Sequence, residues 1–193
     1  GDGMANALEL KQGSNPADAA STTLKATPGL WYNPQRSGHG LDLQHAGNTQ
    51  FVTWYTYADD GTPVWYQGAA PRANPWVAEL NRYTWNPATG TAVGTVVGEI
   101  RLQFSDAAQA TMQWRLGSRS GSEGMQSLLA GSAPANPERT GTWYQRSEPG
   151  WGLTVHAAGS LRVAIAYFYD GNRQPRWVLG SGSNEAVESL AMQ

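Results

Sequence analysis

Apolar and polar residues alternate with a period of two along much of the chain. The clearest case is the segment LRVAIAYFY at 161–169. Such alternation is typical of a β-strand that buries one of its faces. The segment is therefore predicted to be a strand, with Leu161, Val163, Ile165, Tyr167 and Tyr169 on one of its faces.

Short segments with the same alternation recur between Gly29 and Ala130. The clearest lie at 49–57, 96–104, 111–116 and 123–130. Turn sequences rich in glycine, asparagine, aspartate and proline separate them, and only the link around 86–95 is longer. About eight sequential strands at this spacing predict an all-β fold, an antiparallel meander closed as a small barrel or folded as a sandwich.

An aromatic, glycine-punctuated segment occurs twice. Residues 29–68 align without a gap with residues 141–180, at an offset of 112 positions. The identical pairs include Gly29/Gly141, Trp31/Trp143, Tyr32/Tyr144, Gly38/Gly150, Gly40/Gly152, Leu41/Leu153, Tyr55/Tyr167, Tyr57/Tyr169, Pro63/Pro175, Trp65/Trp177 and Gly68/Gly180. We interpret the match as a tandem duplication of a β-domain. The first copy is predicted to be complete at 29–132, and the second partial at 139–193.

The tryptophans divide into two groups. Four recur in both copies and are predicted to fill the interior of a small barrel: Trp31, Trp65, Trp143 and Trp177. Four others lack a counterpart and are candidate ligand-binding residues: Trp54, Trp76, Trp85 and Trp151. If Tyr55 follows the core alternation, Trp54 points outward. Exposed rings of this kind stack on sugars, anchor protein contacts, or stand as isolated surface aromatics.

Composition and charge narrow the classes of partner that can be expected. Charged residues make up 15% of the chain and its net charge is −2, with no basic patch. Nucleic acid and anionic membrane surfaces are therefore not expected as partners. No apolar run reaches the roughly 20 residues of a membrane span. The absence of cysteine excludes disulfides, thiol catalysis and cysteine-ligated zinc.

No catalytic motif stands out, so the chain is predicted not to be an enzyme. Its histidines have no metal-ligand spacing and are predicted to lie on the surface or in turns: His39, His45 and His156. Its carboxylates form no evident pair. Asp59 and Asp60 fall in a predicted turn, whereas Glu79, Glu99 and Glu123 fall on separate predicted strands.

The first residues resemble the end of a calcium loop. In an EF-hand-type loop, a glycine at position 6 allows the turn and a glutamate at position 12 binds the ion. Gly3 fits position 6, and the candidate calcium ligands are Asp2, Met4, Asn6 and Glu9. The earlier ligands would precede Gly1, so the site is incomplete in this chain. The alternative is an ordinary helix N-terminus. In both cases a short helix would follow and end at Gly13.

The stretch at 1–18 is also similar to a thrombospondin type 3-like calcium repeat of bacterial secreted proteins. The matching residues are Glu9, Leu10, Gly13, Asn15, Pro16 and Asp18. Residues 19–28 are rich in small side chains and are predicted to be a linker. Both ends of the chain fall within a motif, which suggests a piece of a longer protein.

The repeated segment resembles a module found in secreted and surface proteins of proteobacteria, often beside a hydrolase or after calcium repeats. The first copy carries the pattern over nearly its full length, from Trp31, Tyr32, Asn33 and Pro34 to Gly61, Pro63, Trp65 and Tyr66. The second copy has Gln145 and Arg146 in place of Asn-Pro, and Ala166 in place of Trp54. The resemblance implies a secreted or cell-surface accessory module.

Two functions follow as hypotheses. The first is a non-catalytic binding module for extracellular glycan or matrix within a larger surface protein, motivated by the unmatched tryptophans. The second is a structural subunit of an extracellular fibre or surface layer, motivated by the partial second copy, which a neighbour would complete by strand exchange. A ligand-carrying barrel of lipocalin type ranks third, because tryptophan and tyrosine would fill its interior.

Overall fold

The computed structural model describes residues 26–128, 140–158, 161–183 and 191–192. This part of the chain is all-β, as the alternation predicts. No helix in it is long and apolar enough to cross a membrane. The predicted calcium loop and helix at 1–18, with most of the predicted linker at 19–28, lie outside the described residues, so those predictions stay untested.

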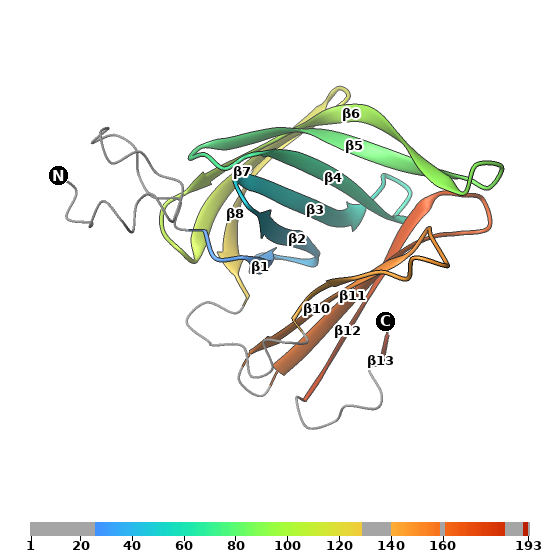
Figure 1. Ribbon diagram of the computed structural model, residues 1–193. Coiled ribbons are helices and arrows are strands. Elements are labelled where there is room, and N and C mark those ends of the chain that lie inside the picture. Colours follow the sequence, from blue (N-terminus) through green and yellow to red (C-terminus); the bar gives the residue numbers. More distant parts are fainter. Residues whose placement is uncertain (1–25, 129–139, 159–160, 184–190, 193) are drawn as a thin grey trace.

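Eight antiparallel strands form a closed barrel in chain order (Figure 1). Their bounds are β1 Gly29–Asn33, β2 Arg36–Ala46, β3 Thr49–Tyr57, β4 Pro63–Pro71, β5 Trp76–Asn86, β6 Thr91–Phe104, β7 Gln109–Leu116 and β8 Arg119–Ser127. The first and last strands close the barrel, because Trp31 pairs with Ser127 and Tyr32 pairs with Gln126. The predicted meander of about eight strands is confirmed, and it closes as a barrel.

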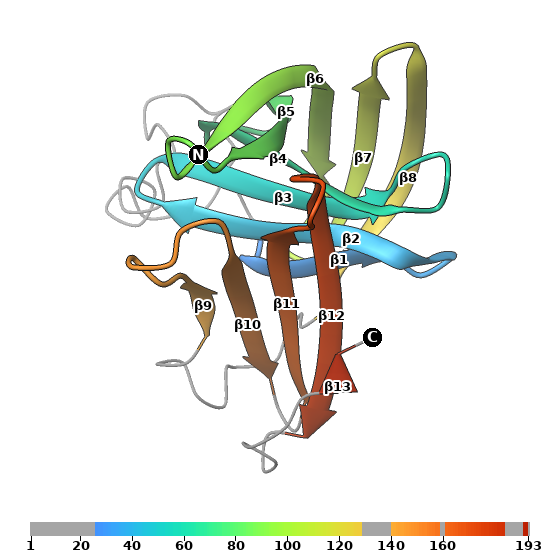
Figure 2. The same cartoon turned by 90° about the vertical axis from the view of Figure 1, so that its right-hand side faces the viewer.

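The remaining strands form a separate open sheet in the order β13-β12-β11-β10-β9. Their bounds are β9 Gly141–Trp143, β10 Gly152–Ala158, β11 Leu161–Tyr169, β12 Pro175–Ser183 and β13 Ala191–Met192. Figure 2 shows this second sheet standing against the outside of the barrel, with β10 to β12 crossing the direction of β2 and β3.

The strands of the second sheet follow those of the barrel at the sequence offset. β3 and β4 span 49–57 and 63–71, and β11 and β12 span 161–169 and 175–183. Their registers also agree, since Tyr55 pairs with Trp65 in the barrel and Tyr167 pairs with Trp177 in the second sheet. The aligned segments therefore adopt the same local structure.

The barrel interior is filled by large rings. Trp31, Trp54 and Trp76 are fully buried there, and Trp54 lies between Trp114 and Tyr66, at ring-centroid distances of 5.2 and 5.7 Å. The prediction that Trp54 and Trp76 are exposed ligand-binding residues is therefore wrong. Their rings form the barrel core.

The error has a simple physical cause. The alternation in β3 is real, but the face that carries Tyr55 and Tyr57 is the outer wall of the barrel, and Trp54 faces inward. Tyr55 is nevertheless buried, because the second sheet covers that wall. Both faces of β3 carry aromatic residues, so its alternation does not show which face is the barrel interior.

A second apolar core lies between the barrel wall and the second sheet. It consists of Leu30, Tyr55 and Trp65 from the barrel and Val163, Ile165, Tyr167 and Trp177 from the second sheet. The rings pair crosswise. Tyr55 packs on Trp177 with centroids 5.2 Å apart, and Trp65 packs on Tyr167 with centroids 6.1 Å apart. Trp65 and Trp177 thus join two sheets, in contrast to their predicted place inside a barrel.

Trp143 also departs from the prediction. Of the recurrent tryptophans, Trp31 lies in the barrel core as expected, but its counterpart Trp143 on β9 is 51% exposed. The barrel encloses Trp31 with eight strands, whereas the second sheet remains open. The same residue is therefore buried in one context and half-exposed in the other.

One end of the barrel holds a buried acid with several donors. The Glu123 side chain is 8% exposed and accepts hydrogen bonds from Asn33 Nδ2 at 3.0 Å, Arg36 Nη1 at 2.9 Å and Trp114 Nε1 at 3.3 Å. His39 Nε2 also contacts this carboxylate, at 3.0 Å from Glu123 Oε2. These contacts connect β8 to the β1–β2 hairpin, and the charge-assisted bonds reinforce barrel closure there.

The predicted surface or turn placement of the histidines is wrong for two of them. His39 and His156 are both buried, at 4% exposure, and His45 is partly buried. Each buried ring is held by a carboxylate, Glu123 for His39 and Asp42 for His156. The expectation that the carboxylates form no pair is also incomplete. Glu79 on β5 and Glu99 on β6 are direct register partners, and both are exposed.

Burial of His39 predicts a stability that falls with acidification. Desolvation lowers the His39 pKa below 6.5, Arg36 lowers it further, and Glu123 opposes the shift. His39 is therefore protonated at a higher pH in the unfolded chain than in the folded chain. The unfolded state gains this proton first, so the free energy of unfolding falls as the pH drops through 6.5.

Urea unfolding midpoints between pH 7.5 and 5.5 check this prediction. The His39→Gln variant should show a shallower pH dependence than the parent chain, with a residual slope from His45, whose pKa burial also lowers. An identical slope in parent and variant would remove His39 from the explanation.

Candidate functional site

A cleft of about 650 Å³ lies between the outer wall of the barrel and the second sheet. Its walls come from β2 to β4, from the β5–β6 hairpin, from the segment before β10 and from β11. The aromatic side chains that line it are Phe51, Trp65, Trp85, Trp151, Tyr167 and Tyr169. A concave site bounded by aromatic rings and a few polar groups is the usual form of a small-ligand site.

The β5–β6 hairpin reaches from the barrel to the second sheet and closes one side of the cleft. Near its end, Trp85 stacks on Tyr169 with ring centroids 5.7 Å apart and an interplanar angle of 29°. Its ring also lies against Gly150, where a Cβ would come within 3.3 Å of the indole. Gly150 has φ of 107°, a conformation that favours glycine. The glycine therefore allows the close approach of the loop to Trp85.

Polar contacts hold this hairpin in place. Arg82 Nη2 donates to Gln174 Oε1 at 2.9 Å, and the Trp85 backbone N–H donates to the Arg173 carbonyl at 3.3 Å. On the neighbouring turn, Arg176 pairs with Asp170 at 2.6 Å. The cleft is thus bounded by two fixed hairpins, one from each sheet.

Trp151 follows Gly150 directly and is 44% exposed at the cleft. Of the four tryptophans predicted to bind a ligand, Trp85 and Trp151 line the cleft together, and Trp54 and Trp76 lie in the barrel core. Trp85 is partly buried by Tyr169 and Gly150, so Trp151 offers the more open ring.

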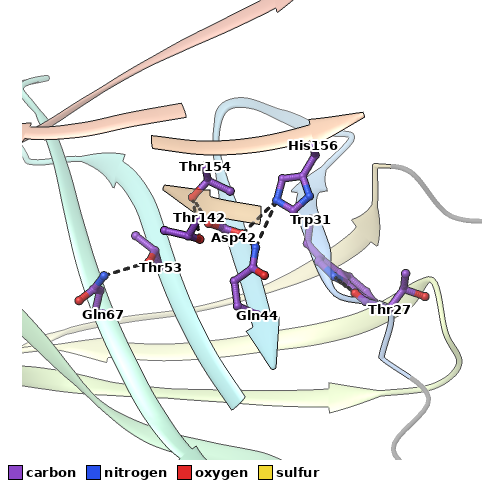
Figure 3. A network of polar contacts seen from close by, with 9 residues as sticks. All are labelled: Thr27, Trp31, Asp42, Gln44, Thr53, Gln67, Thr142, Thr154 and His156. Atoms are coloured by element: carbon purple, nitrogen blue, oxygen red, sulfur yellow. Dashed lines mark hydrogen bonds and ion pairs between the residues drawn. The ribbon is translucent and has the colours of Figure 1, made fainter. Parts of the chain in front are cut away.

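A buried carboxylate, that of Asp42, lines the cleft and is held in a network of polar contacts (Figure 3). Asp42 on β2 is 3% exposed, and the Thr154 hydroxyl donates to its Oδ2 at 2.7 Å. Gln44 Nε2 donates to Asp42 Oδ1 at 2.7 Å, and His156 Nε2 lies 3.2 Å from the same oxygen. These partners come from both sheets, so the network joins the barrel to the second sheet.

The sequence offset explains why these residues meet. Asp42 aligns with Thr154 and Gln44 aligns with His156, and each aligned pair is in contact across the interface. The crosswise pairing of Tyr55 with Trp177 and of Trp65 with Tyr167 has the same form. Contacts of this kind arise when two similar surfaces pack face to face about an approximate two-fold axis. The sequence-based predictions gave no role to Asp42, Gln44 or Thr154 and placed His156 on the surface or in a turn, although the gapless alignment pairs the four positions.

Further polar groups surround the aromatic rings. Thr142, Thr53 and Gln67 line the cleft, and Gln67 Nε2 donates to Thr53 Oγ1 at 3.3 Å. Amide and hydroxyl groups can exchange such bonds for bonds to a hydroxylated ligand. The arrangement provides flat apolar faces beside neutral hydrogen-bonding groups.

The predicted calcium ligands Asp2, Met4, Asn6 and Glu9 lie outside the described residues. Within the described part, no group of three or more histidine, aspartate or glutamate side chains is placed to hold a metal ion. The calcium prediction concerns the N-terminal residues and stays open.

Comparison of the chain with protein-family models, with curated protein sequences and with solved structures finds no match in any of the three.

Proposed function

We propose that the chain is a non-catalytic module that binds extracellular glycan in the cleft between the barrel and the second sheet. The observation that carries the proposal is the half-exposed Trp151 ring, set beside Trp85 and neutral polar side chains in one cleft. The C–H face of a sugar ring packs on an indole, and its hydroxyls bond to amide and hydroxyl groups beside it.

Replacement of Trp151 by alanine should weaken glycan binding by about 1–3 kcal/mol, by analogy with base–aromatic stacking. Affinity electrophoresis in gels that contain single soluble polysaccharides measures the effect. Tyr144→Ala is the matched control, because Tyr144 is 70% exposed and does not line the cleft. Equal retardation of the Trp151→Ala variant and the parent chain would exclude stacking at this position.

The remaining features of the proposal rest on the sequence and, for the duplicated β-domain, also on the fold. A duplicated β-domain is supported by strands and registers that repeat at the offset, and by Gly29 and Gly141, whose φ angles are 133° and 137°. Attachment to a larger secreted or surface protein, and calcium binding by the first residues, rest on the resemblances described above.

A second candidate is a structural subunit of an extracellular assembly, and the open second sheet favours it. Within the described part of the chain, the barrel is closed, whereas the second sheet is open and has β9 and β13 as its outermost strands. An open sheet can accept a further strand from another chain. Light scattering behind a sizing column distinguishes the candidates, since a subunit would form large assemblies without glycan. A monomer over a wide concentration range would contradict it.

A further inference from the structure

Two side-chain polar atoms on residues that line the cleft are buried and lack a hydrogen-bond partner within the described part of the chain. They are Nε1 of Trp65 on β4 and the hydroxyl of Tyr167 on β11. Trp65 is 6% exposed and Tyr167 is 9% exposed, so each is more than nine-tenths buried. A buried donor without an acceptor destabilises the fold, and native proteins rarely leave one unpaired.

The counterpart of Trp65 at the aligned position makes the indole hydrogen bond that Trp65 lacks. Trp177 occupies the aligned position, and its Nε1 donates to the backbone carbonyl of Thr56 at 2.8 Å. Both indoles pack in the same interface core. The two sides of the interface differ, since Trp65 lines the cleft and Trp177 does not. A hydrogen-bond acceptor on a ligand would give Trp65 Nε1 the partner that the Thr56 carbonyl provides for Trp177 Nε1.

The charge of the cleft limits what that ligand can be. Of the described residues that line the cleft, Asp42 alone is charged, and none is lysine, arginine or histidine. The Asp42 carboxylate is already engaged by Thr154, Gln44 and His156. An anionic ligand would meet a negative charge without a cation lining the cleft to bind it, which opposes its entry into a partly desolvated site.

We propose that the cleft binds a neutral saccharide and that, as it binds, the rings of Trp65 and Tyr167 part, so that one sugar hydroxyl lies at the floor of the cleft between Trp65 Nε1 and the Tyr167 hydroxyl, which are closed to solvent in the free protein. This inference rests on the proposed glycan-binding function. A hydroxyl is both donor and acceptor, so a single group can accept from the indole and bond to the phenol. The two rings pack edge to face with their centroids 6.1 Å apart, so the two residues are neighbours in the cleft wall.

The state of Tyr167 supports this arrangement. Burial, with Asp42 and Tyr55 adding to it, raises the pKa of Tyr167 well above 10. The phenol therefore keeps its proton at neutral pH and can both donate and accept. The cavity volume of about 650 Å³ also falls within the range of roughly 300–1,000 Å³ that is usual for small-ligand sites.

Paired polysaccharides test the charge preference with the full chain. Gels are prepared with hydroxyethyl cellulose, galactomannan, arabinoxylan, pullulan or laminarin as neutral probes, and with carboxymethyl cellulose, alginate or polygalacturonate as anionic probes. Retardation is expected from at least one neutral probe and should be lost in Trp151→Ala. Anionic probes that bind as tightly, with the same dependence on Trp151, would overturn the neutral-ligand inference and leave glycan binding intact. Retardation by no probe would overturn the proposed function itself.

Tyr167→Phe tests whether the Tyr167 hydroxyl bonds to the sugar, and the measurement uses whichever neutral polysaccharide binds the parent chain. The substitution removes only the hydroxyl, so affinity should fall by about 3- to 10-fold, the loss of one ordinary hydrogen bond. The urea midpoint should stay unchanged or rise, since the lost group has no partner in the free protein. Tyr144→Phe is the control and should change neither value. Unchanged affinity in Tyr167→Phe would overturn the placement of a sugar hydroxyl at the floor.

Discussion

Trp54→Ala is expected to lower the free energy of unfolding by about 3–5 kcal/mol, the usual cost of removing a buried tryptophan from a core. Trp54 is 1% exposed, packs on Trp114 and Tyr66, and donates from Nε1 to His39 Nδ1 at 3.4 Å. The variant loses these contacts and leaves a cavity inside a closed barrel. Since domains are stable by about 5–15 kcal/mol, this is a large share of the total.

Urea denaturation followed by circular dichroism measures the loss. Trp151→Ala is the matched control, because Trp151 is 44% exposed and its removal should leave the unfolding midpoint nearly unchanged. The two tryptophans thus separate stability from binding. A Trp54→Ala variant that unfolds at the parent midpoint but loses glycan binding would contradict the inward orientation of Trp54.

Asp42→Ala should loosen the second sheet from the barrel at a cost of about 3 kcal/mol. The aspartate is 3% exposed, and its removal leaves the Thr154 hydroxyl and the His156 ring buried without their acceptor. Removing one partner of a buried charged network generally costs about 3–5 kcal/mol, because the other groups stay desolvated. We take the lower end, since the cleft admits water beside the network.

Hydrogen exchange locates the Asp42 effect. Amides of β10 and β11 should exchange faster in Asp42→Ala, while those of β6 and β7, on strands without contacts to the second sheet core, should keep their protection. Asp42→Asn retains one acceptor oxygen and should show a smaller change. Uniform loss of protection over both sheets would mean that the network supports the whole fold and not this interface.

The sequence predicted the barrel well because each of its strands carries a local signal. Alternation in β3 and β6, with Asp-Gly and Gly-Asn turns between strands, determines a meander without any long-range information. The orientation of the strands could not be predicted in the same way. β3 is apolar on both faces, because Trp54 fills the barrel and Tyr55 packs against the second sheet, and the second contact is between distant parts of the chain.

Two aromatic residues of the cleft were predictable from the sequence, but its polar residues were not, for the same reason. Trp85 and Trp151 stood out because no counterpart occupies their aligned positions, and both line the cleft. Asp42 and Thr154 carried no local motif, and their roles depend on two sheets that pack face to face. They occupy aligned positions 112 residues apart, and the Thr154 hydroxyl donates to Asp42 across the interface.

The most direct test of a neutral saccharide in the cleft is a titration of the nine tryptophan indole N–H signals by ¹⁵N NMR. With the neutral polysaccharide fragment that binds, the Trp65 and Trp151 signals should shift and saturate together. The Trp31, Trp54 and Trp76 signals, from the barrel core, should stay in place. Saturable shifts confined to indoles outside the cleft, with Trp65 unmoved, would contradict the account.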